Sequence, residues 1–364
     1  MKKIIAMLLC VVCFTSCADE NDTTTDNIIK IAVIKNSGTQ YEYFEKGIDL
    51  AYREVSEEYK DSGYVVECNF YDNDGTNEGI SAITERLAND PSVSVIIGSS
   101  DNEIAKNQSL ITQNSEKILV CPGWVNDDNM TSSNDMVFSV IYSNDDMAVT
   151  IKSITESLPE MNWAVCAPIN NITFREIQYF KKKETKNVVD YCDIDDLEIY
   201  FDKIKKRWES LDVKGIVFLP YSEDDIDVLL NIKKEMPDIY IVSDFDMDSW
   251  EKYDQNPQMF ENVYIADGFF VDKSDEKYKA EKEKFEDTWM THGYNTFKML
   301  ADTAVKNNTA DPRQIAKILH TNGYSGIGEE FNFADNGVLI PTKYNYIDMG
   351  ALEEHAISPE TEGK

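Results

Sequence analysis

The chain has 364 residues and carries 67 acidic side chains against 35 lysines and arginines, a formal net charge of −32 at pH 7. So negative a field repels nucleic acid and anionic lipid surfaces, which argues against both as partners. The length exceeds that at which one hydrophobic core keeps growing, so we expect more than one lobe.

The beginning of the chain predicts export. Two lysines precede an apolar run over residues 4–14 that is too short to cross a bilayer as a stable helix, as in a secretory signal. The sequence FTSC that ends at Cys17 resembles the lipobox of bacterial lipoproteins, whose cysteine becomes the lipidated first residue. We expect a signal peptide over residues 1–17, a lipid at Cys17 and an acidic tether over residues 18–27. An ordinary signal cleaved nearby is the alternative.

From residue 28 onward, short β-branched runs alternate with amphipathic helical stretches. Strands are predicted at residues 28–35, 63–74, 93–98 and 118–122. Helices are predicted at residues 41–59, 76–89 and 102–114. Near-continuous apolar strands joined by helical crossovers indicate a parallel sheet covered on both faces.

The pattern then begins again, which predicts a second lobe. Strands are predicted at residues 161–169, 188–194, 214–221 and 239–245. Helices are predicted at residues 172–185, 196–210 and 224–236.

The lobes are expected to be joined by ordered strands. Residues 136–148 and 261–270 predict two crossings, and the helices 275–290 and 294–307 follow the second. No Pro/Gly/Ser linker interrupts the interior, so the connection is a hinge rather than a flexible string.

The order of these segments resembles the type I solute-binding proteins, the periplasmic leucine/isoleucine/valine-binding group of ABC importers. The resemblance covers residues 28–350. Its landmarks, in order, are IKIAVI, FEKGIDLA, FYDNDGTNEG, VSVIIGSS with ILVCP, GIVFLPYSEDD, GYNTFKMLADTAVKNN with DPRQIAKILHTNGYSGIGEEFNFADNG, and KYNYIDM. The resemblance implies an α/β fold of two Rossmann-like lobes with parallel central sheets, joined by a multi-strand hinge and closing on a small ligand.

The resemblance also implies a division of the chain. The N-terminal lobe is expected to take residues 28–141 plus 271–328, and the C-terminal lobe residues 142–270 plus 329–350. Residues 351–364 are expected to be an acidic tail.

In open α/β sheets, ligands sit beyond the carboxyl ends of the strands. In the first lobe this rule predicts the ligand-binding residues Ser37, Thr39, Tyr41, Ser99, Ser100, Asp101, Asn102, Gly123 and Trp124. In amino-acid-binding relatives, hydroxyls in the loops that correspond to residues 99–102 and 123–125 hold the ligand carboxylate. Here Asp101 and Val125 fall near such positions, where a carboxylate repels and a valine offers no hydrogen bond.

Two of these residues have a structural alternative. Asp101 precedes a helix and could serve as its cap. Trp124 is expected to cover an apolar face of the ligand, and the alternative is a packed residue of the lobe.

In the second lobe, the predicted ligand-binding residues are Asn170, Tyr221, Asp244 and Asp246. In relatives, an acidic residue near the two aspartates receives the ligand ammonium; surface carboxylates are the alternative. The family's Tyr-Gly pair is absent from the loop that contains Asn170.

The cysteines and histidines argue against a metal or cofactor, since His292 and His320 fall at predicted helix ends and His355 in the tail. Cys68, Cys121, Cys166 and Cys192 have no CxxC spacing and are expected to be buried thiols, although export permits disulfides. The acidic loop at Asp72 lacks an EF-hand register, and no nucleotide-binding or hydrolase motif occurs. We expect no cofactor, no metal site and no catalytic residues.

The sequence therefore predicts a monomeric binding protein, not an enzyme, anchored by lipid in the cell envelope and facing outside the cytoplasm. It would capture a small polar, amino-acid-like or other small-metabolite ligand and deliver it to an ABC permease. The alternative is a ligand-sensing subunit for a membrane receptor without transport. An exported hydrolase is disfavoured because no nucleophile and base are paired.

Overall fold

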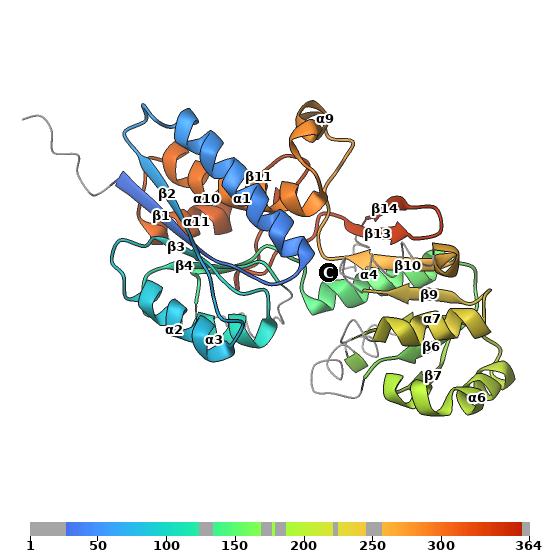
Figure 1. Ribbon diagram of the computed structural model, residues 1–364. Coiled ribbons are helices and arrows are strands. Elements are labelled where there is room, and N and C mark those ends of the chain that lie inside the picture. The colour runs from blue at the N-terminus through green and yellow to red at the C-terminus, as the bar shows by residue number, and fades with distance from the viewer. Residues whose placement is uncertain are drawn as a thin grey trace, which may run out of the picture.

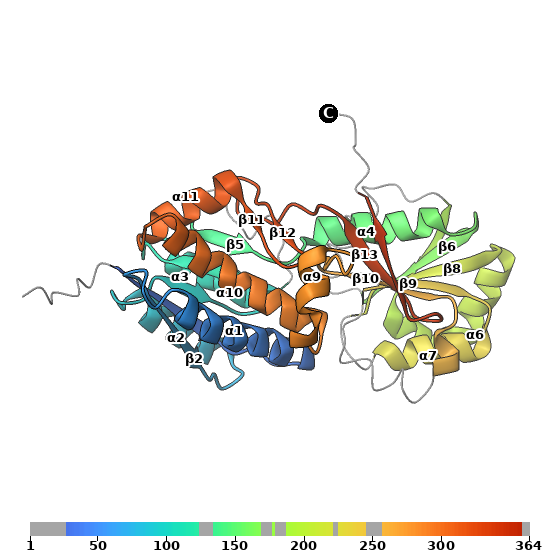
Figure 2. The same cartoon turned by 90° about the horizontal axis from the view of Figure 1, so that it is seen from above.

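The computed structural model describes residues 27–123, 134–168, 177–178, 187–220, 225–244 and 257–358. These residues form two α/β units, each built on its own sheet, which lie side by side in Figures 1 and 2. No helix in the described residues is long and apolar enough to cross a membrane.

The first sheet has five parallel strands in the order β2-β1-β3-β4-β5. They are β1 (Ile28–Ile34), β2 (Val65–Tyr71), β3 (Val95–Ile97), β4 (Ile118–Cys121) and β5 (Val137–Ser139). Alternate side chains of a strand point to opposite faces. In β1, Ile31 and Val33 therefore enter one core, and Ala32 and Ile34 enter another.

Helices cover both faces of this sheet. The larger core contains α1 (Thr39–Glu58), α10 (Thr288–Lys306) and α11 (Pro312–Asn322). The smaller core contains α2 (Asn77–Ala88) and α3 (Asn102–Thr112). Because α10 and α11 come from late in the sequence, the first unit is completed by a distant segment of the chain (Figure 1).

The second sheet repeats this order and extends it. Its strands run β14-β13-β10-β9-β8-β6-β7. The parallel ones are β6 (Asn162–Cys166), β7 (Val188–Cys192), β8 (Val213–Phe218), β9 (Tyr240–Ser243) and β10 (Val263–Asp267). Two antiparallel strands follow, β13 (Tyr344–Asp348) and β14 (Glu353–Ile357).

The second sheet is also covered on both faces. Helix α4 (Asn144–Ser157) packs on one face, where Trp163 and Val165 of β6 lie in its core. Helices α6 (Ile194–Ser210) and α7 (Asp225–Glu235) pack on the other. The smaller elements are η3 (Pro257–Phe260), α9 (Glu276–Glu281), η4 (Lys282–Lys284), β11 (Tyr324–Ser325) and β12 (Glu330–Phe331).

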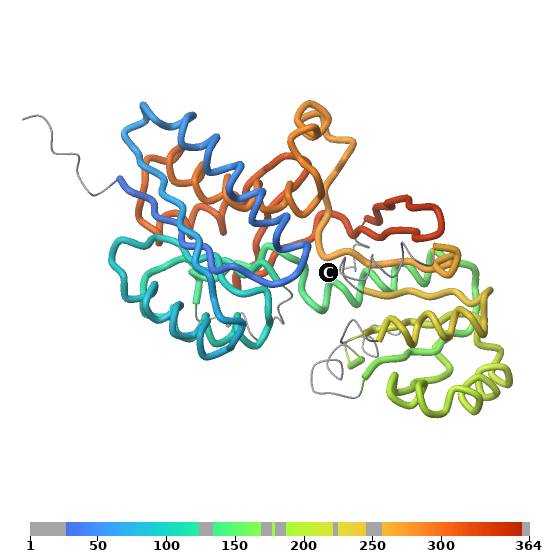
Figure 3. Tube along the Cα trace, viewed as in Figure 1, coloured from blue at the N-terminus to red at the C-terminus, as the bar shows by residue number. Residues whose placement is uncertain are grey.

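Three segments pass between the units, and Figure 3 follows the chain through them. They lie between β5 and α4, between β10 and α9, and between β12 and β13. Tyr142 joins all three: its N–H donates to the Gly268 carbonyl (2.8 Å) and its hydroxyl to the Lys343 carbonyl. The side chain is buried, and burial raises its pKa well above the usual value. The three crossing segments are thus packed together around the side chain of Tyr142.

The helices after the second crossing differ from the prediction. The break falls at residues 285–287 rather than at 291–293, and α10 runs unbroken through Gly293. Asp287 starts this helix because its carboxylate accepts the Trp289 N–H at 2.7 Å. His292, expected at a helix end, is consequently buried inside α10.

The C-terminal part of the chain also departs from expectation. Residues 353–357 of the predicted acidic tail form β14, because they pair with β13. Phe331, Phe333 and Leu339, which the sequence analysis gave to the second lobe, lie in the larger core of the first sheet.

Candidate functional site

The loops that follow β1 and β3 meet where the strand order of the first sheet reverses. Asn36 donates from Nδ2 to the Gly98 carbonyl (3.1 Å), and its Oδ1 accepts the Ser100 N–H (2.7 Å). The loop after β4 also approaches, since a Cβ on Gly123 would lie 1.8 Å from the Ser100 carbonyl oxygen. The structure therefore brings three of the predicted loops of the first lobe together.

Within these loops, Asp101 has the structural role that the sequence left open. Its Oδ1 accepts the Ile104 N–H at 2.9 Å and caps α3, which begins at Asn102. Ser99 is buried, and its hydroxyl accepts the Asp101 N–H at 3.1 Å. Ser37 and Thr39 flank Gly38, which precedes α1 with a φ of 106° and has no side chain to cap that helix.

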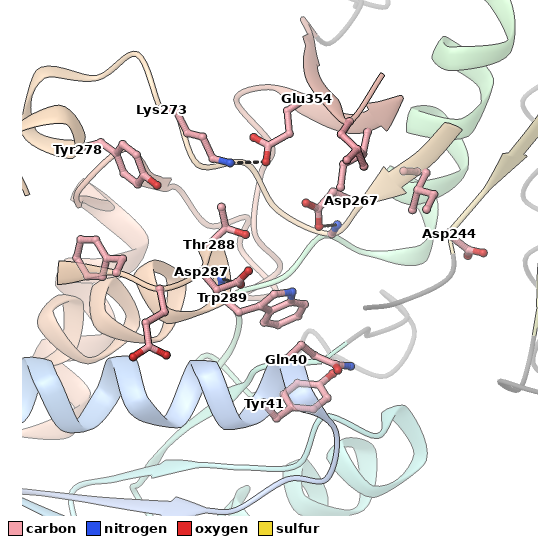
Figure 4. Close-up of a pocket in the computed structure, with 17 residues that line it drawn as sticks. Gln40, Tyr41, Asp244, Asp267, Lys273, Tyr278, Asp287, Thr288, Trp289 and Glu354 are labelled. Atoms are coloured by element: carbon pink, nitrogen blue, oxygen red, sulfur yellow. Dashed lines mark hydrogen bonds and ion pairs between the residues drawn. The ribbon is translucent and has the colours of Figure 1, made fainter. Parts of the chain in front are cut away.

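A cavity of about 460 Å³ lies between the two units (Figure 4). It is lined by residues of α1 and α10, of the second sheet and its loops, and of the second crossing: Gln40, Tyr41, Asp244, Ile265, Ala266, Asp267, Gly268, Lys273, Tyr278, Phe285, Glu286, Asp287, Thr288, Trp289, Ile347, Leu352 and Glu354. The carboxyl ends of β9 and β10 reach it, as expected for a ligand site on an α/β sheet.

Aromatic side chains form one wall of this cavity. Tyr41, from the first turn of α1, meets Trp289 edge to face with ring centroids 5.5 Å apart. Trp289 in turn packs on Phe269 at 4.8 Å. In Figure 4, Gln40 and Tyr41 lie opposite Asp267. The wall offers an apolar surface to a ligand.

Asp267, the last residue of β10, is the central polar group on the opposite side. Its Oδ1 accepts the Gly268 N–H at 2.8 Å, and its Oδ2 lies 3.4 Å from Nδ2 of Asn345. Burial raises the pKa of this carboxyl to about 7, although the hydrogen bond from Gly268 opposes the shift. A positively charged group in the cavity would stabilise the ionised form.

The remaining charges leave the cavity negative. Among its described lining residues, Lys273 is the one cation, and it is paired with Glu354. Asp244 and Asp287 add carboxylates, and burial raises the pKa of Asp287. Glu286 is 3.1 Å from Lys46 outside the cavity. This balance favours a ligand with a positive group.

Of the predicted ligand-binding residues, Tyr41 and Asp244 line the cavity. Trp124, Asn170, Tyr221, Asp246 and the lipidation residue Cys17 lie outside the described residues.

The predicted ligand-binding residues did not include Gln40, Asp267, Asp287 or Trp289. A signal existed for Asp267, since it ends an apolar strand just before a glycine. For Trp289 only the helix start at Asp287 would have pointed to the cavity.

The carboxylates of the acidic loop after β2 are already engaged in contacts within the protein. Asp72 pairs with Lys35 at 2.8 Å, and Asp74 accepts the Thr76 N–H. Among the residues that the structure describes, no group of three His, Cys, Asp or Glu side chains could hold a metal ion.

The fold is similar to that of solved solute-binding proteins. An ABC transporter substrate-binding protein from Desulfitobacterium hafniense matches with a TM-score of 0.75 at 18% identity, over 91% of this chain and 100% of that one. LivJ from Streptococcus pneumoniae, in complex with isoleucine, matches with a TM-score of 0.72 at 17% identity, over 91% and 100%. A solute-binding protein from R. palustris, in complex with benzoate, matches with a TM-score of 0.70 at 14% identity, over 91% and 96%.

No family model and no curated protein matches the sequence. The solved structures nevertheless align over nearly the whole of both chains, and they include several branched-chain amino acid binding proteins. The chain therefore has the fold of the type I periplasmic binding proteins.

Proposed function

We propose that this protein is an extracytoplasmic solute-binding protein, anchored through a lipid on Cys17, that delivers a small amine-bearing solute to an ABC permease. The matched structures support the binding role, since they are substrate- or solute-binding proteins in complex with leucine, isoleucine or benzoate. The sequence of the first seventeen residues supports the anchor.

The observation that carries the ligand class is Asp267 at the wall of the cavity between the two units. A carboxylate that is disfavoured by burial gains most from an ammonium group placed against it. Asp244 at the end of the neighbouring strand can share that charge. Across the cavity, the N-terminus of α1 favours a negative group such as a carboxylate, so an amino-acid-like solute suits both sides.

Titration calorimetry with a panel of small solutes tests this proposal. The panel should pair each amine with its deaminated analogue, and should include amino acids, amines and carboxylic acids. We expect an amine to bind and its analogue to bind at least tenfold more weakly. Asp267→Asn should abolish that preference, whereas Asp227→Asn on the exposed surface of α7 should leave it unchanged.

Preferential binding of deaminated acids by the unmodified protein would contradict the assigned ligand class.

Uptake of the identified ligand by cells lacking the protein separates transport from sensing. Loss of uptake supports delivery to a permease, and normal uptake with a lost cellular response supports a receptor subunit.

A further inference from the structure

Two cysteines lie side by side on neighbouring strands of the second sheet. Cys166 ends β6, Cys192 ends β7, and the two are direct partners in the parallel register. Partners in register point to the same face, and adjacent strands are about 4.8 Å apart, within the Cα separation of a disulfide. The two Sγ atoms are 2.9 Å apart.

The surroundings hold this pair in place. Beyond the cysteines, the Ala167 N–H donates to the Cys192 carbonyl (3.2 Å) and the Ile194 N–H to the Ala167 carbonyl (3.3 Å). Two residues before Cys192, the Asp190 carboxylate accepts hydrogen bonds from α6, from Arg207 Nε and Trp208 Nε1, each at 2.9 Å. The pair is therefore fixed from both the sheet and the helix above it.

The two thiols differ in access. Cys166 is fully buried, and burial raises the pKa of its thiol well above the usual value. Cys192 is half-buried and lines a separate cavity of about 480 Å³ together with Asp193, Tyr200 and Lys203. A reagent in that cavity meets Cys192 first.

The other two cysteines lack such a neighbour. Cys68 is on β2 and Cys121 on β4, with β1 and β3 between them in the sheet. Three strand spacings of about 4.8 Å are too far for a disulfide. Burial raises the pKa of both thiols to about 12, so each is a poor nucleophile.

We propose that Cys166 and Cys192 form a redox pair that becomes an intrachain disulfide on exposure to a thiol–disulfide oxidant, with Cys192 as the entry thiol. This inference does not rest on the ligand proposed above.

The reaction proceeds by two exchanges. The Cys192 thiol loses its proton to solvent, and its thiolate attacks a sulfur of the oxidant RSSR, which breaks the S–S bond and releases RS⁻. The Cys166 thiol then loses its proton, attacks the Cys192 sulfur of the mixed disulfide and releases a second RS⁻. Two protein thiols are oxidised to one disulfide, and the oxidant is reduced to two thiols by the same two electrons.

The disulfide would link the edge strand β7 covalently to its neighbour β6 in the second sheet. Strand β7 is an edge strand, with Val189 and Tyr191 exposed on it. Cys166 is the last residue of β6, at the carboxyl end of that strand. The disulfide closes a 26-residue separation and so constrains the unfolded chain as well as the strand edge.

Mass spectrometry of the full chain tests the pair. The protein is treated with oxidised glutathione, alkylated under denaturing conditions and digested without reduction. We expect a peptide linked through Cys166 and Cys192, with Cys68 and Cys121 alkylated. The melting temperature should rise by roughly 4–8 °C on oxidation and return on reduction. Full alkylation of both Cys166 and Cys192 after oxidation of the native protein would overturn the proposal.

Single variants test the order of attack. Cys166→Ala should trap glutathione on Cys192, whereas Cys192→Ala should leave Cys166 unmodified while the protein is folded. Cys68→Ala is the matched control and should still form the linked peptide. Equal trapping on Cys166 in the Cys192→Ala variant, with an unchanged circular dichroism spectrum, would refute Cys192 as the entry thiol.

Discussion

The carboxylates of Asp267 and Asp101 each accept a backbone N–H, but they differ in how far they are buried. Asp101 is an exposed cap with a backbone N–H as its partner, a role that its position before a helix indicated in advance. Asp267 is buried against a cavity, and that environment depends on residues from α1, α10 and β14 that are distant in sequence. A strand-end aspartate was predictable from the sequence, but its raised pKa was not, because desolvation depends on the assembled units.

Asp267→Asn tests the electrostatic cost of that position. A carboxyl whose folded pKa is raised binds its proton more tightly when folded, so its contribution to stability is present below about pH 4. It is lost as the pH rises toward the folded pKa of about 7. We expect the variant to match the unmodified protein near pH 4 and to be more stable at pH 8. The gain should be at most about 4 kcal/mol, because water in the cavity lessens the shift.

Urea unfolding at pH 4, 6 and 8 measures this difference. Asp275→Asn is the control: Asp275 caps α9 outside the cavity and asparagine caps as well, so stability at pH 8 should fall by no more than about 1 kcal/mol. An Asp267→Asn variant less stable than the parent at pH 8 would show that the ionised carboxylate is well solvated.

Two helices from opposite ends of the sequence meet through glycine. A Cβ on Gly47 of α1 would lie 2.0 Å from the Met290 carbonyl oxygen, and one on Gly293 of α10 would lie 1.9 Å from that of Phe44. Gly47 lies within the helix predicted at residues 41–59, whereas Gly293 falls in the gap between the predicted helices 275–290 and 294–307. The backbone contact explains why α10 continues, and local periodicity could not reveal it.

Helix α10 also contributes His292 and Asn295 to a buried hydrogen-bonded cluster that the sequence did not suggest. His292 Nδ1 lies 2.7 Å from Glu329 Oε1, and Asn295 Nδ2 donates to Glu329 Oε2 at 2.6 Å. The imidazole is stacked on Phe269 at 4.4 Å. This buried group fixes the segment between β11 and β12 to α10.

Gly47→Ala should destabilise the first unit strongly. Alanine improves intrinsic helix propensity by about 1 kcal/mol, but here its methyl group meets backbone that cannot move without separating α1 from α10. We expect a net loss of about 3 kcal/mol or more in the free energy of unfolding. Gly63→Ala is the control: its φ of 80° is strained for alanine, but no atom lies within 4 Å of the added Cβ, so about 1–2 kcal/mol is expected.

Chemical denaturation of both variants measures the two costs. Equal losses would mean that the helices separate easily at their crossing.

At the scale of the whole molecule, the two units share one design. Each has parallel strands in the order 2-1-3-4-5, and each therefore has a strand-order reversal that places its loops at the carboxyl ends. The alternation of apolar runs and helices made this architecture predictable. The landmark KYNYIDM corresponds to β13, but the pairing of β12 and β14 was not predictable, because β12 has two residues and β14 pairs with β13 alone.

Cys17→Ala tests the proposed attachment to the membrane. A lipidated cysteine holds a protein at the bilayer through its acyl chains, each buried methylene contributing about 0.8 kcal/mol. We expect the variant to lose its fatty acylation and to appear in the soluble or unprocessed fraction after cell fractionation. Cys68→Ala should remain with the membranes, and membrane attachment of the Cys17→Ala variant at the parental level would rule out this anchor.

Closure of the two units on a ligand would depend on the three crossing segments. Periplasmic binding proteins as a class close by hinge motion. A ligand that contacts α1 on one side and Asp267 on the other favours a closed arrangement only by its differential affinity for it. At about 100 times its Kd it should also stabilise the folded protein by about 2.7 kcal/mol. Small-angle scattering should therefore show a smaller radius of gyration at the ligand concentrations that raise the melting temperature.

Tyr142→Phe separates the hinge from the ligand site. It removes the hydroxyl that donates to Lys343 and leaves the cavity lining intact, so stability should fall by about 1 kcal/mol. With one link between the crossings lost, the unliganded variant should scatter as a more expanded particle, and ligand should compact it by more than it compacts the parent. If ligand raises the melting temperature of the parent while its scattering curve stays unchanged, the cavity binds without closure and the three crossings act as a rigid joint.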